Sequence, residues 1–347
     1  MYTVGLDVDT HSIMNNLAAG VLGINYKNYS STNKNSYYST PILDQKYPQT
    51  SPSLLASNPL GRGQAEGRGM LPDASQEIGK ISDHMKKHEK PLGEAEFGYY
   101  LAGLIEGDGY FGDQRLEILF FEKDITLAYY IKKRIGYGSV YFIKDKRAVK
   151  YVLRHTAGLK YVLDLVNGKF LTNCKINQLL KHDYGTKFMI MHDKGGQRGG
   201  QVILPPANFS LMTNHYLAGF TDSDGYFGIS TPKDKSSKHF SGGGIRVRLR
   251  FVLGQKYPTI LQKVKSEFGG YLYHYKSTDN YLLELSSFSQ NLKVIEYFDK
   301  FNLNSIKHLA FFKWRKAYRI VQRKEHLTEK GLSKIKLLGK SISELIK

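Results

Sequence analysis

A stretch of thirteen residues occurs twice in the chain and constrains its fold more than any other feature. Tyr100 to Gly112 reads YLAGLIEGDGYFG, and Tyr216 to Gly228 reads YLAGFTDSDGYFG. The two copies lie 116 residues apart and agree at 9 of 13 positions. The glycine-rich segment 191–206 separates the halves that carry them. Repetition at one offset predicts two halves of similar fold joined by a linker.

Hydrophobic periodicity gives both halves the same order of elements. In the first half we expect strands at 114–121, 139–144 and 147–154, and helices at 125–135, 159–166 and 175–182. In the second half we expect strands at 244–253, 271–276 and 281–285, and helices at 259–268, 289–301, 306–323 and 328–346. Thr328 is suited to cap the last helix. The sequence therefore predicts an α+β fold with an αββαββα order in each half.

The region before the first copy differs in composition. Residues 11–92 are rich in Asn, Ser, Gly and Pro and contain few apolar residues. Such a segment buries too little surface to offset its chain entropy. The stretch GRGQAEGRG at 61–69 is either a flexible linker or an RNA-binding tail. We expect a flexible segment at 1–92, domains at 93–190 and 207–325, a linker at 191–206 and a C-terminal helix at 326–347.

The repeated stretch begins with a helical pattern. Leu101, Leu104 and Ile105 follow the i, i+3, i+4 spacing of a core-facing side. Gly103 and Gly219, each preceded by alanine, are small enough to let two helix backbones approach closely. Gly109 ends the helix in the first copy. Two such helices packed together would bring the acids of both copies to one end.

Asp108 and Asp224 are the acids at that end, and they are our candidate catalytic and metal-binding residues. An acid at a helix C-terminus is electrostatically unfavourable, and a bound divalent cation would offset that cost. Two carboxylates that share hard cations suit the cleavage of a phosphodiester bond. The alternatives are solvated acids or a Ca²⁺ loop at EGDG. The repetition of the motif disfavours solvated acids, and the lack of EF-hand spacing disfavours a Ca²⁺ loop.

Charge favours a polyanionic partner. There are 50 Lys and Arg residues against 31 Asp and Glu, so the formal net charge is +19. Nucleic acid is the first candidate partner, and an acidic membrane surface is the second. The single cysteine, Cys174, excludes an intrachain disulfide and a cysteine-based zinc site. The sequence shows no transmembrane run and no pattern of a secretory signal.

The strand expected at 244–253 carries the strongest DNA-binding pattern. Arg246, Arg248 and Arg250 alternate with apolar residues, which predicts one arginine face and one packed face. Arginine can contact phosphates or guanine edges, although a generic solvated face would show the same alternation. The tyrosines at 271, 273 and 275 also alternate and suit packing at least as well as DNA contact. In the first half Arg115 is a weaker candidate, because it shares a face with an acid.

The motifs LAGLIEGDG and LAGFTDSDG resemble those of double-motif LAGLIDADG homing endonucleases, over about residues 93–330. The resemblance implies motif helices at the interface of two pseudo-symmetric halves and saddle-shaped antiparallel sheets that face DNA. It implies Mg²⁺ bound by the two aspartates, with the carbonyls of Gly107 and Ser223 near the metal. Glu106 and Asp222 would be structural.

Further residues follow from the same resemblance. Lys175 and Lys307 would orient the attacking water or offset phosphate charge, and generic exposed lysines are the alternative. Gln255 matches a polar position after the first long strand. The first half has Glu122 there, a departure that suggests unequal half-sites and unequal cleavage of the two strands.

The first ten residues, MYTVGLDVDT, resemble cytochrome c oxidase subunit I, unless the match is due to chance. The resemblance implies a reading frame in a group I intron of that mitochondrial gene, with translation in the matrix. We expect a monomer that binds double-stranded DNA at the intron insertion site and cleaves both strands, without a membrane partner. An RNA maturase that assists splicing of its own intron is the alternative, and a DNA-binding regulator is a more distant one.

Overall fold

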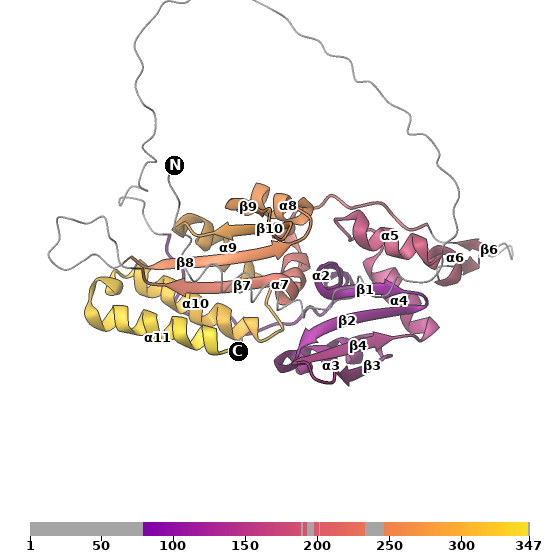
Figure 1. Cartoon of the computed structure of the whole chain (residues 1–347), viewed down its shortest axis with the longest axis horizontal. Helices are drawn as coiled ribbons and strands as arrows, with labels where there is room; N and C mark the ends of the chain where they lie inside the picture. Colours follow the sequence, from indigo (N-terminus) through magenta and orange to yellow (C-terminus); the bar gives the residue numbers. More distant parts are fainter. Residues whose placement is uncertain (1–78, 189, 193–197, 201, 233–245, 346–347) are drawn as a thin grey trace, which may run out of the picture. The chain divides into compact units, whose positions relative to one another are not determined.

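The computed structural model describes residues 79–345 except 189, 193–197, 201 and 233–245 (Figure 1). The expectations for the first ten residues and for the stretch 61–69 lie outside the described residues. So does the start of the strand expected at 244–253.

Each half of the described chain has the predicted αββαββα order. In the first half the elements are α2 (Glu94–Asp108), β1 (Gly109–Gly112), β2 (Arg115–Phe121), α3 (Ile125–Ile135), β3 (Ser139–Phe142), β4 (Ala148–Leu153) and α4 (Thr156–Val166). In the second half they are α7 (Tyr216–Asp224), β7 (Gly225–Ser230), β8 (Arg248–Gln255), α8 (Thr259–Phe268), β9 (Tyr271–Tyr275), β10 (Asn280–Leu285) and α9 (Phe288–Lys300). The α+β prediction is therefore confirmed.

The two sheets share one topology. Their strand orders are β1-β2-β4-β3 and β7-β8-β10-β9, and neighbouring strands are antiparallel (Figure 1). The glycine after each motif acid lies at the same place, with Gly109 opposite Ile118 and Gly225 opposite Leu253. Hydrophobic periodicity gave no residue ranges for β1 and β7, because these short strands begin with glycine and contain a second one. Each continues directly from its motif helix and so ties the acid to the sheet.

Further helices follow each αββαββα unit. They are α5 (Asn173–Lys181), α6 (Tyr184–Phe188), α10 (Lys307–Gln322) and α11 (Glu329–Leu345), with short 3-10 turns at Glu122–Asp124, Leu211–Thr213 and Glu325–Leu327. Thr328 Oγ1 accepts a hydrogen bond from the Gly331 backbone N–H at 3.0 Å, which confirms the predicted cap of α11. Within the described part of the chain, no helix is long and apolar enough to cross a membrane.

The motif helices α2 and α7 pack against each other with their backbones in contact. A Cβ atom placed on Gly103 would lie 2.0 Å from the Tyr216 carbonyl oxygen, and one on Gly219 would lie 1.9 Å from the Tyr100 carbonyl oxygen. Side chains larger than hydrogen are therefore excluded at both glycines, as the motif predicted. Leu101 is fully buried in this contact region.

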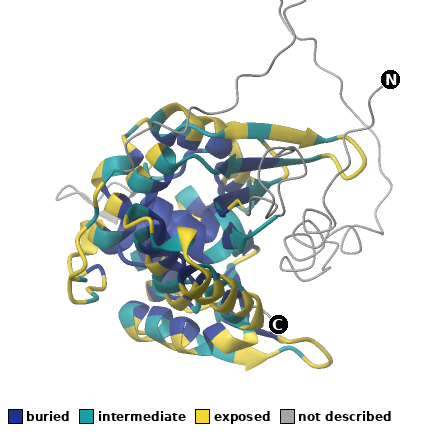
Figure 2. Ribbon diagram, turned by 90° about the vertical axis from the view of Figure 1, so that its left-hand side faces the viewer, coloured by how far each residue is buried: buried dark blue, intermediate teal, exposed yellow. Residues whose placement is uncertain are grey.

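Both halves contribute to a continuous set of buried apolar side chains (Figure 2). The sequences of α2 and α7 are apolar around most of the helix and not along one stripe, which fits the burial of both helices on nearly all sides. Gly109 and Gly225 have extended conformations, with φ of −86° and −89°. Glycine at these helix ends therefore serves close packing, because a Cβ on Gly109 would lie 2.7 Å from Ile105 Cα.

Residues 79–92, which we call the N-terminal strap, correct the expectation that all of 1–92 is a flexible segment. The strap has no helix or strand, but its carbonyls accept hydrogen bonds from α10. The Ser82 carbonyl accepts from Arg315 at 3.0 Å, and the Gly79 carbonyl accepts from Tyr318 at 3.0 Å. At its other end the Pro91 carbonyl accepts from Arg134 of α3 at 2.6 Å. The strap therefore contacts both halves.

The described parts of the predicted linker at 191–206 form regular structure and hydrogen bonds. Strands β5 (Ile190–His192) and β6 (Arg198–Gly200) pair with each other. Further on, the Leu204 N–H donates to Asn167 Oδ1 at 2.9 Å, and the Ala207 N–H donates to the Phe170 carbonyl at 2.7 Å. The end of the linker is therefore bonded to the loop between α4 and α5.

The helix contact can be tested with matched serine substitutions. Gly219→Ser places a Cβ against backbone atoms that cannot move aside, so we expect a loss of at least about 1–3 kcal/mol of stability and loss of function. Gly93→Ser, at the start of α2, is the control, because its nearest contact would be 3.9 Å. Thermal unfolding of both variants measures the difference. Equal melting temperatures would show that the helices do not need this close contact.

The strap can be tested by two truncations. Removal of residues 1–78 keeps every contact described above, whereas removal of 1–92 leaves the buried Arg315 without its carbonyl partner. Because several hydrogen bonds are lost, we expect the shorter protein to be less stable by about 2 kcal/mol, which lowers its melting temperature by roughly 4–8 °C. Identical melting curves for the two truncations would show that the strap adds no stability and that the folded part begins at residue 93, as expected from the sequence.

Candidate active site

The two motif acids lie at the ends of the two helices that are in contact. Asp108 ends α2 and is half-buried, and Asp224 ends α7 and is buried. Between them the backbone is tight, since a Cβ on Gly107 would lie 2.6 Å from Asp224 Oδ2 and even closer to the Ser223 side chain. The structure therefore brings the acids of the two repeats together at one place.

This pair of carboxylates is electrostatically unfavourable. Burial raises the pKa of Asp108, and the charge of Asp224 raises it further. Burial also raises the pKa of Asp224, although Lys307, Lys175 and a hydrogen bond from Gln255 oppose the rise. Two like charges held close together in a partly desolvated site form a place where a cation is favoured.

Lys175 and Lys307 lie beside the acids and are not generic exposed lysines. Lys175 is 7% exposed and donates to the Gly109 carbonyl at 2.5 Å. Lys307 donates to the last carbonyls of α7, at 3.2 Å to Thr221, 3.0 Å to Asp222 and 2.5 Å to Ser223. A positive charge at a helix C-terminus is favourable, so Lys307 also offsets the unfavourable position of the acid.

The two lysines are not equivalent in hydrogen-bond register. At the start of α5 the Cys174 N–H donates to Thr172 Oγ1, and at the start of α10 the Lys307 N–H donates to Ser305 Oγ. Cys174 therefore occupies the position of Lys307, and Lys175 lies one residue later. This shift explains why the two ammonium groups reach different carbonyls.

The first acids of the motifs make hydrogen bonds that join the halves. Asp222 accepts from the hydroxyl of Tyr100, in the other half, at 2.6 Å and from the Ser305 N–H at 3.1 Å. In the reverse direction Glu106 accepts from Tyr216 and from the Thr172 N–H. Each acid thus holds the loop that leads to a lysine-bearing helix, which agrees with the structural role that the resemblance implied.

Of the two residues predicted after the first long strands, the structure brings one to the pair. Gln255 donates to Asp224 Oδ2 at 2.6 Å. Glu122 is exposed, and its carboxylate faces Arg147 at 3.9 Å. The strand registers show that the counterpart of Gln255 is the buried Phe120. Glu122 therefore does not lie at the acid pair, because it stands two residues after the position that matches Gln255.

The three arginines expected on one face have three different environments. Arg248 opens β8 and is half-buried, whereas Arg246 precedes the strand and is exposed. Arg250 is 6% exposed and lies 4.0 Å from Glu284 of β10. No acid was expected beside these arginines, but strand pairing supplies one. Tyr271 and Tyr273, both exposed, lie on the neighbouring β9, on this same side of the sheet.

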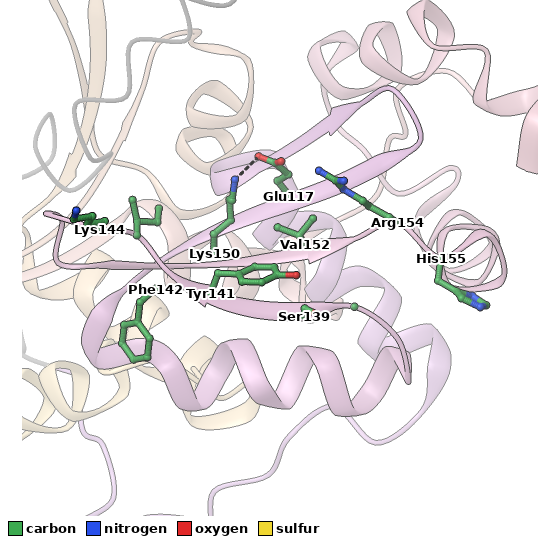
Figure 3. Close-up of a pocket in the computed structure, with 11 residues that line it drawn as sticks. Glu117, Ser139, Tyr141, Phe142, Lys144, Lys150, Val152, Arg154 and His155 are labelled. Atoms are coloured by element: carbon green, nitrogen blue, oxygen red, sulfur yellow. Dashed lines mark hydrogen bonds and ion pairs between the residues drawn. The ribbon is translucent and has the colours of Figure 1, made fainter.

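The matching face of the first sheet is hollowed. A pocket of about 670 Å³ is lined by residues of three of the four strands, β2, β3 and β4, and Figure 3 shows Glu117, Tyr141 and Lys150 in its wall. Glu117 pairs with Lys150 at 3.2 Å and with Arg115 at 3.1 Å. The predicted Arg115 is therefore part of a charge network on this face.

One buried acid close to the site was not predicted. Asp124 precedes α3, where an aspartate normally caps its own helix, but its carboxylate accepts from the Ile306 N–H at 2.5 Å. Burial raises the pKa of Asp124 to about 6, against the effects of this hydrogen bond and of Lys307. The position of Asp124 before a helix is typical of an N-cap, and only the fold shows that its carboxylate bonds the start of another helix.

The donor set at the helix ends fits a hard divalent cation. Asp108 and Asp224 supply carboxylate oxygens, and the carbonyl of Gly107 lies in the same turn as Asp108. The carbonyl of Ser223, beside Asp224, already accepts a hydrogen bond from Lys307 at 2.5 Å, so a cation would compete with that ammonium group for this oxygen. Over the described ranges, no group of three or more His, Cys, Asp and Glu side chains is arranged to hold a metal. A cation here would need oxygens from water and from a phosphate to complete its shell, as expected where substrate is a ligand.

Comparisons with known proteins agree with this geometry. A model of the LAGLIDADG endonuclease family matches residues 217–318. The uncharacterized cox1 intron-2 37.2 kDa protein of Schizosaccharomyces pombe is 40% identical over 288 residues, which are 82% of this chain and 83% of that protein. The intron-encoded DNA endonuclease aI3 of Saccharomyces cerevisiae is 26% identical over 271 residues, 67% of this chain and 65% of its own length.

Solved structures show the same fold. The I-SmaMI LAGLIDADG homing endonuclease bound to cleaved DNA superposes with a TM-score of 0.54 at 19% identity, over 73% of this chain and 97% of that one. The I-AabMI LAGLIDADG meganuclease bound to uncleaved DNA gives 0.51 at 21% identity, over 70% and 98%. With the paired motifs, their acids at the helix contact and the 40% identical relative, the chain belongs to the LAGLIDADG endonuclease family.

Proposed function

We propose that this chain is a site-specific endonuclease that cleaves both strands of DNA for intron homing. The observation that carries the proposal is the meeting of Asp108 and Asp224 at the contact of two repeated helices, with one lysine from each half beside them, Lys175 buried and Lys307 half-buried. The direct test is incubation with Mg²⁺ of DNA that spans the intronless insertion site, scored for double-strand breaks.

The proposed chemistry divides among named groups. A divalent cation, for which we propose Mg²⁺, would be held by Asp108 and Asp224 and would activate water and stabilise the departing oxygen. Lys175 and Lys307 place positive charge where a scissile phosphate adds negative charge. Gln255, through its hydrogen bond, fixes the orientation of the Asp224 carboxylate in one half only.

DNA would bind across the sheet faces that do not contact the core. On the second sheet this face carries Arg248, Tyr271 and Tyr273, and on the first it is the hollow around Lys150. Arg246 lies at the entry to β8 and suits a phosphate contact. Because these side chains differ between the sheets, the two half-sites of the DNA would differ in sequence.

The relatives and the first ten residues support a proposal about the gene that encodes the protein and the compartment in which it acts. Similarity to a cox1 intron protein and to an intron-encoded endonuclease supports a reading frame in a mitochondrial group I intron, with action in the matrix. Both motif acids come from one chain, which supports a monomer that is active alone. One solved relative was studied on uncleaved DNA with calcium, which supports the use of divalent cations.

The intron RNA is the second candidate partner. Tyr271 and Tyr273 are 65% and 45% exposed on one face of β9, and exposed aromatic rings can stack on unpaired bases. A maturase would not need the paired acids, so tight binding of intron RNA without DNA cleavage would favour this alternative.

The acids are tested by Asp108→Asn and Asp224→Asn. We expect each variant to lose double-strand cleavage by at least about 10²-fold while DNA affinity stays within a few-fold, because the cation loses a charged ligand. Removal of one repelling charge should leave the melting temperature unchanged or higher. Plasmid linearisation and gel shifts measure the effects, with the exposed Asp164→Asn as control. Full linearisation by either variant would remove that acid from the reaction.

The arginines are tested by Arg248→Ala and Arg250→Ala. We expect Arg248→Ala to weaken DNA binding and to reduce the slope of log affinity against log salt by about one, because one phosphate contact is lost. Arg250→Ala should instead lower the melting temperature, since Glu284 loses its partner in a largely buried place. Titrations at several salt concentrations, with melting curves, separate the two. An unstable Arg248 variant, or a stable Arg250 variant with a reduced slope, would reverse the assignment.

A further inference from the structure

Asp124 makes a contact that crosses from one half to the other. It stands between β2 and α3, is 5% exposed, and makes no side-chain cap of α3. Its Oδ1 atom accepts from the backbone N–H of Ile306, the residue just before α10 in the second half, at 2.5 Å. A buried carboxylate is costly unless it is bonded, so this contact fixes the two backbones to each other.

The contact is made one residue before a lysine of the site. Asp222 accepts from the N–H groups of Asn304 and Ser305, and Asp124 accepts from the next one, that of Ile306. These three N–H groups lie on the residues immediately before α10, and the two acids supply their acceptors. Lys307 follows directly, and its ammonium group lies on the carbonyls at the end of α7. The place of Lys307 is therefore set by an acid from each half.

In the part of the chain that the structure describes, the start of the helix that carries Lys175 has no equivalent of this second acid. Lys175 lies on α5, whose start is held by Glu106 through Leu171 and Thr172. The residue that precedes α8, where Asp124 precedes α3, is Pro258, which has no side-chain acceptor. Among the described residues, the contact from the strand end of one half to the lysine helix of the other thus runs in one direction.

We infer that Asp124 is a positioning residue for the cleavage reaction, which holds Lys307 of the second half from the first half. The inference rests on the proposed endonuclease function. Asp124 follows β2, a central strand of the first sheet, by three residues. Cleavage of the DNA strand that Lys307 serves therefore depends on a contact from the first half, whereas Lys175 has no matching contact from the residue before α8 in the second half.

The test measures the two strands separately. A duplex cleaved by the unaltered protein is labelled at either end, and single-turnover rates of each strand are compared for Asp124→Ala and for the control Asp164→Ala, an exposed residue of α4. We expect the Asp124 variant to slow one strand on the order of 10-fold more than the other, so that nicked DNA accumulates, because a charge-assisted hydrogen bond is lost. DNA affinity should stay within a few-fold.

Two further variants keep the test decisive. Asp124→Asn retains an oxygen acceptor for Ile306 and should restore near-normal rates on both strands. If Asp124→Ala does not fold, Asp124→Ser takes its place: the serine side chain is too short to reach Ile306, so this variant should show the same unequal slowing of the two strands. Equal slowing of both strands, no slowing, or an asparagine variant as defective as alanine would overturn the inference. If the unaltered protein does not cleave, the proposed function fails instead.

Discussion

The close backbone contact of α2 and α7 is the constraint on which the rest of the structure depends. Gly103 lets α2 contact the backbone of α7 at Tyr216, and Gly219 lets α7 contact the backbone of α2 at Tyr100. The hydroxyls of Tyr100 and Tyr216 then reach acids of the opposite helix and fix the helices along their length. At the end of this contact the helices hold the carboxylates of Asp108 and Asp224 close together. Helix packing thus creates a site whose charges oppose packing, as is common where function requires strain.

The topology of the halves is symmetric, but their side chains are not. Both sheets have one strand order and one register at the motif glycine, so the backbone frame is repeated. Around the acids, Gln255 has Phe120 as its counterpart, and Lys307 has Cys174. A symmetric frame with unequal side chains suits a DNA target whose two halves differ, because each half can read its own sequence.

Much of this arrangement could be predicted from the repeat. One motif repeated at one offset indicated both halves, both acids and the small residues at the helix contact, since these depend on local spacing. The periodic helices at 125–135 and 259–268 were placed at their observed bounds. Features set by pairing between distant strands were not predictable. Glu284 reaches Arg250 only because β10 lies beside β8, and register alone shows which residue matches Gln255.

The N-terminal strap escaped prediction for a different reason. Its bonds to Arg315 and Tyr318 use backbone carbonyls, so the side chains of 79–92 need no periodic pattern. Asp124 was missed because an aspartate before a helix usually caps that helix, and nothing local shows that its partner lies in the other half. Local sequence patterns indicate what a residue does within its own helix or strand. Contacts between distant elements can be identified only once the fold is known.

If Asp108 and Asp224 share one cation site, neither acid alone can bind the cation. Binding of Mn²⁺ to the complex with uncleaved DNA, followed by electron paramagnetic resonance, tests this directly. The shared site predicts bound Mn²⁺ in the unaltered protein and its loss in Asp108→Asn and in Asp224→Asn alike. Retention of Mn²⁺ with full affinity in either single variant would show that the acids act separately and would contradict this account of the site.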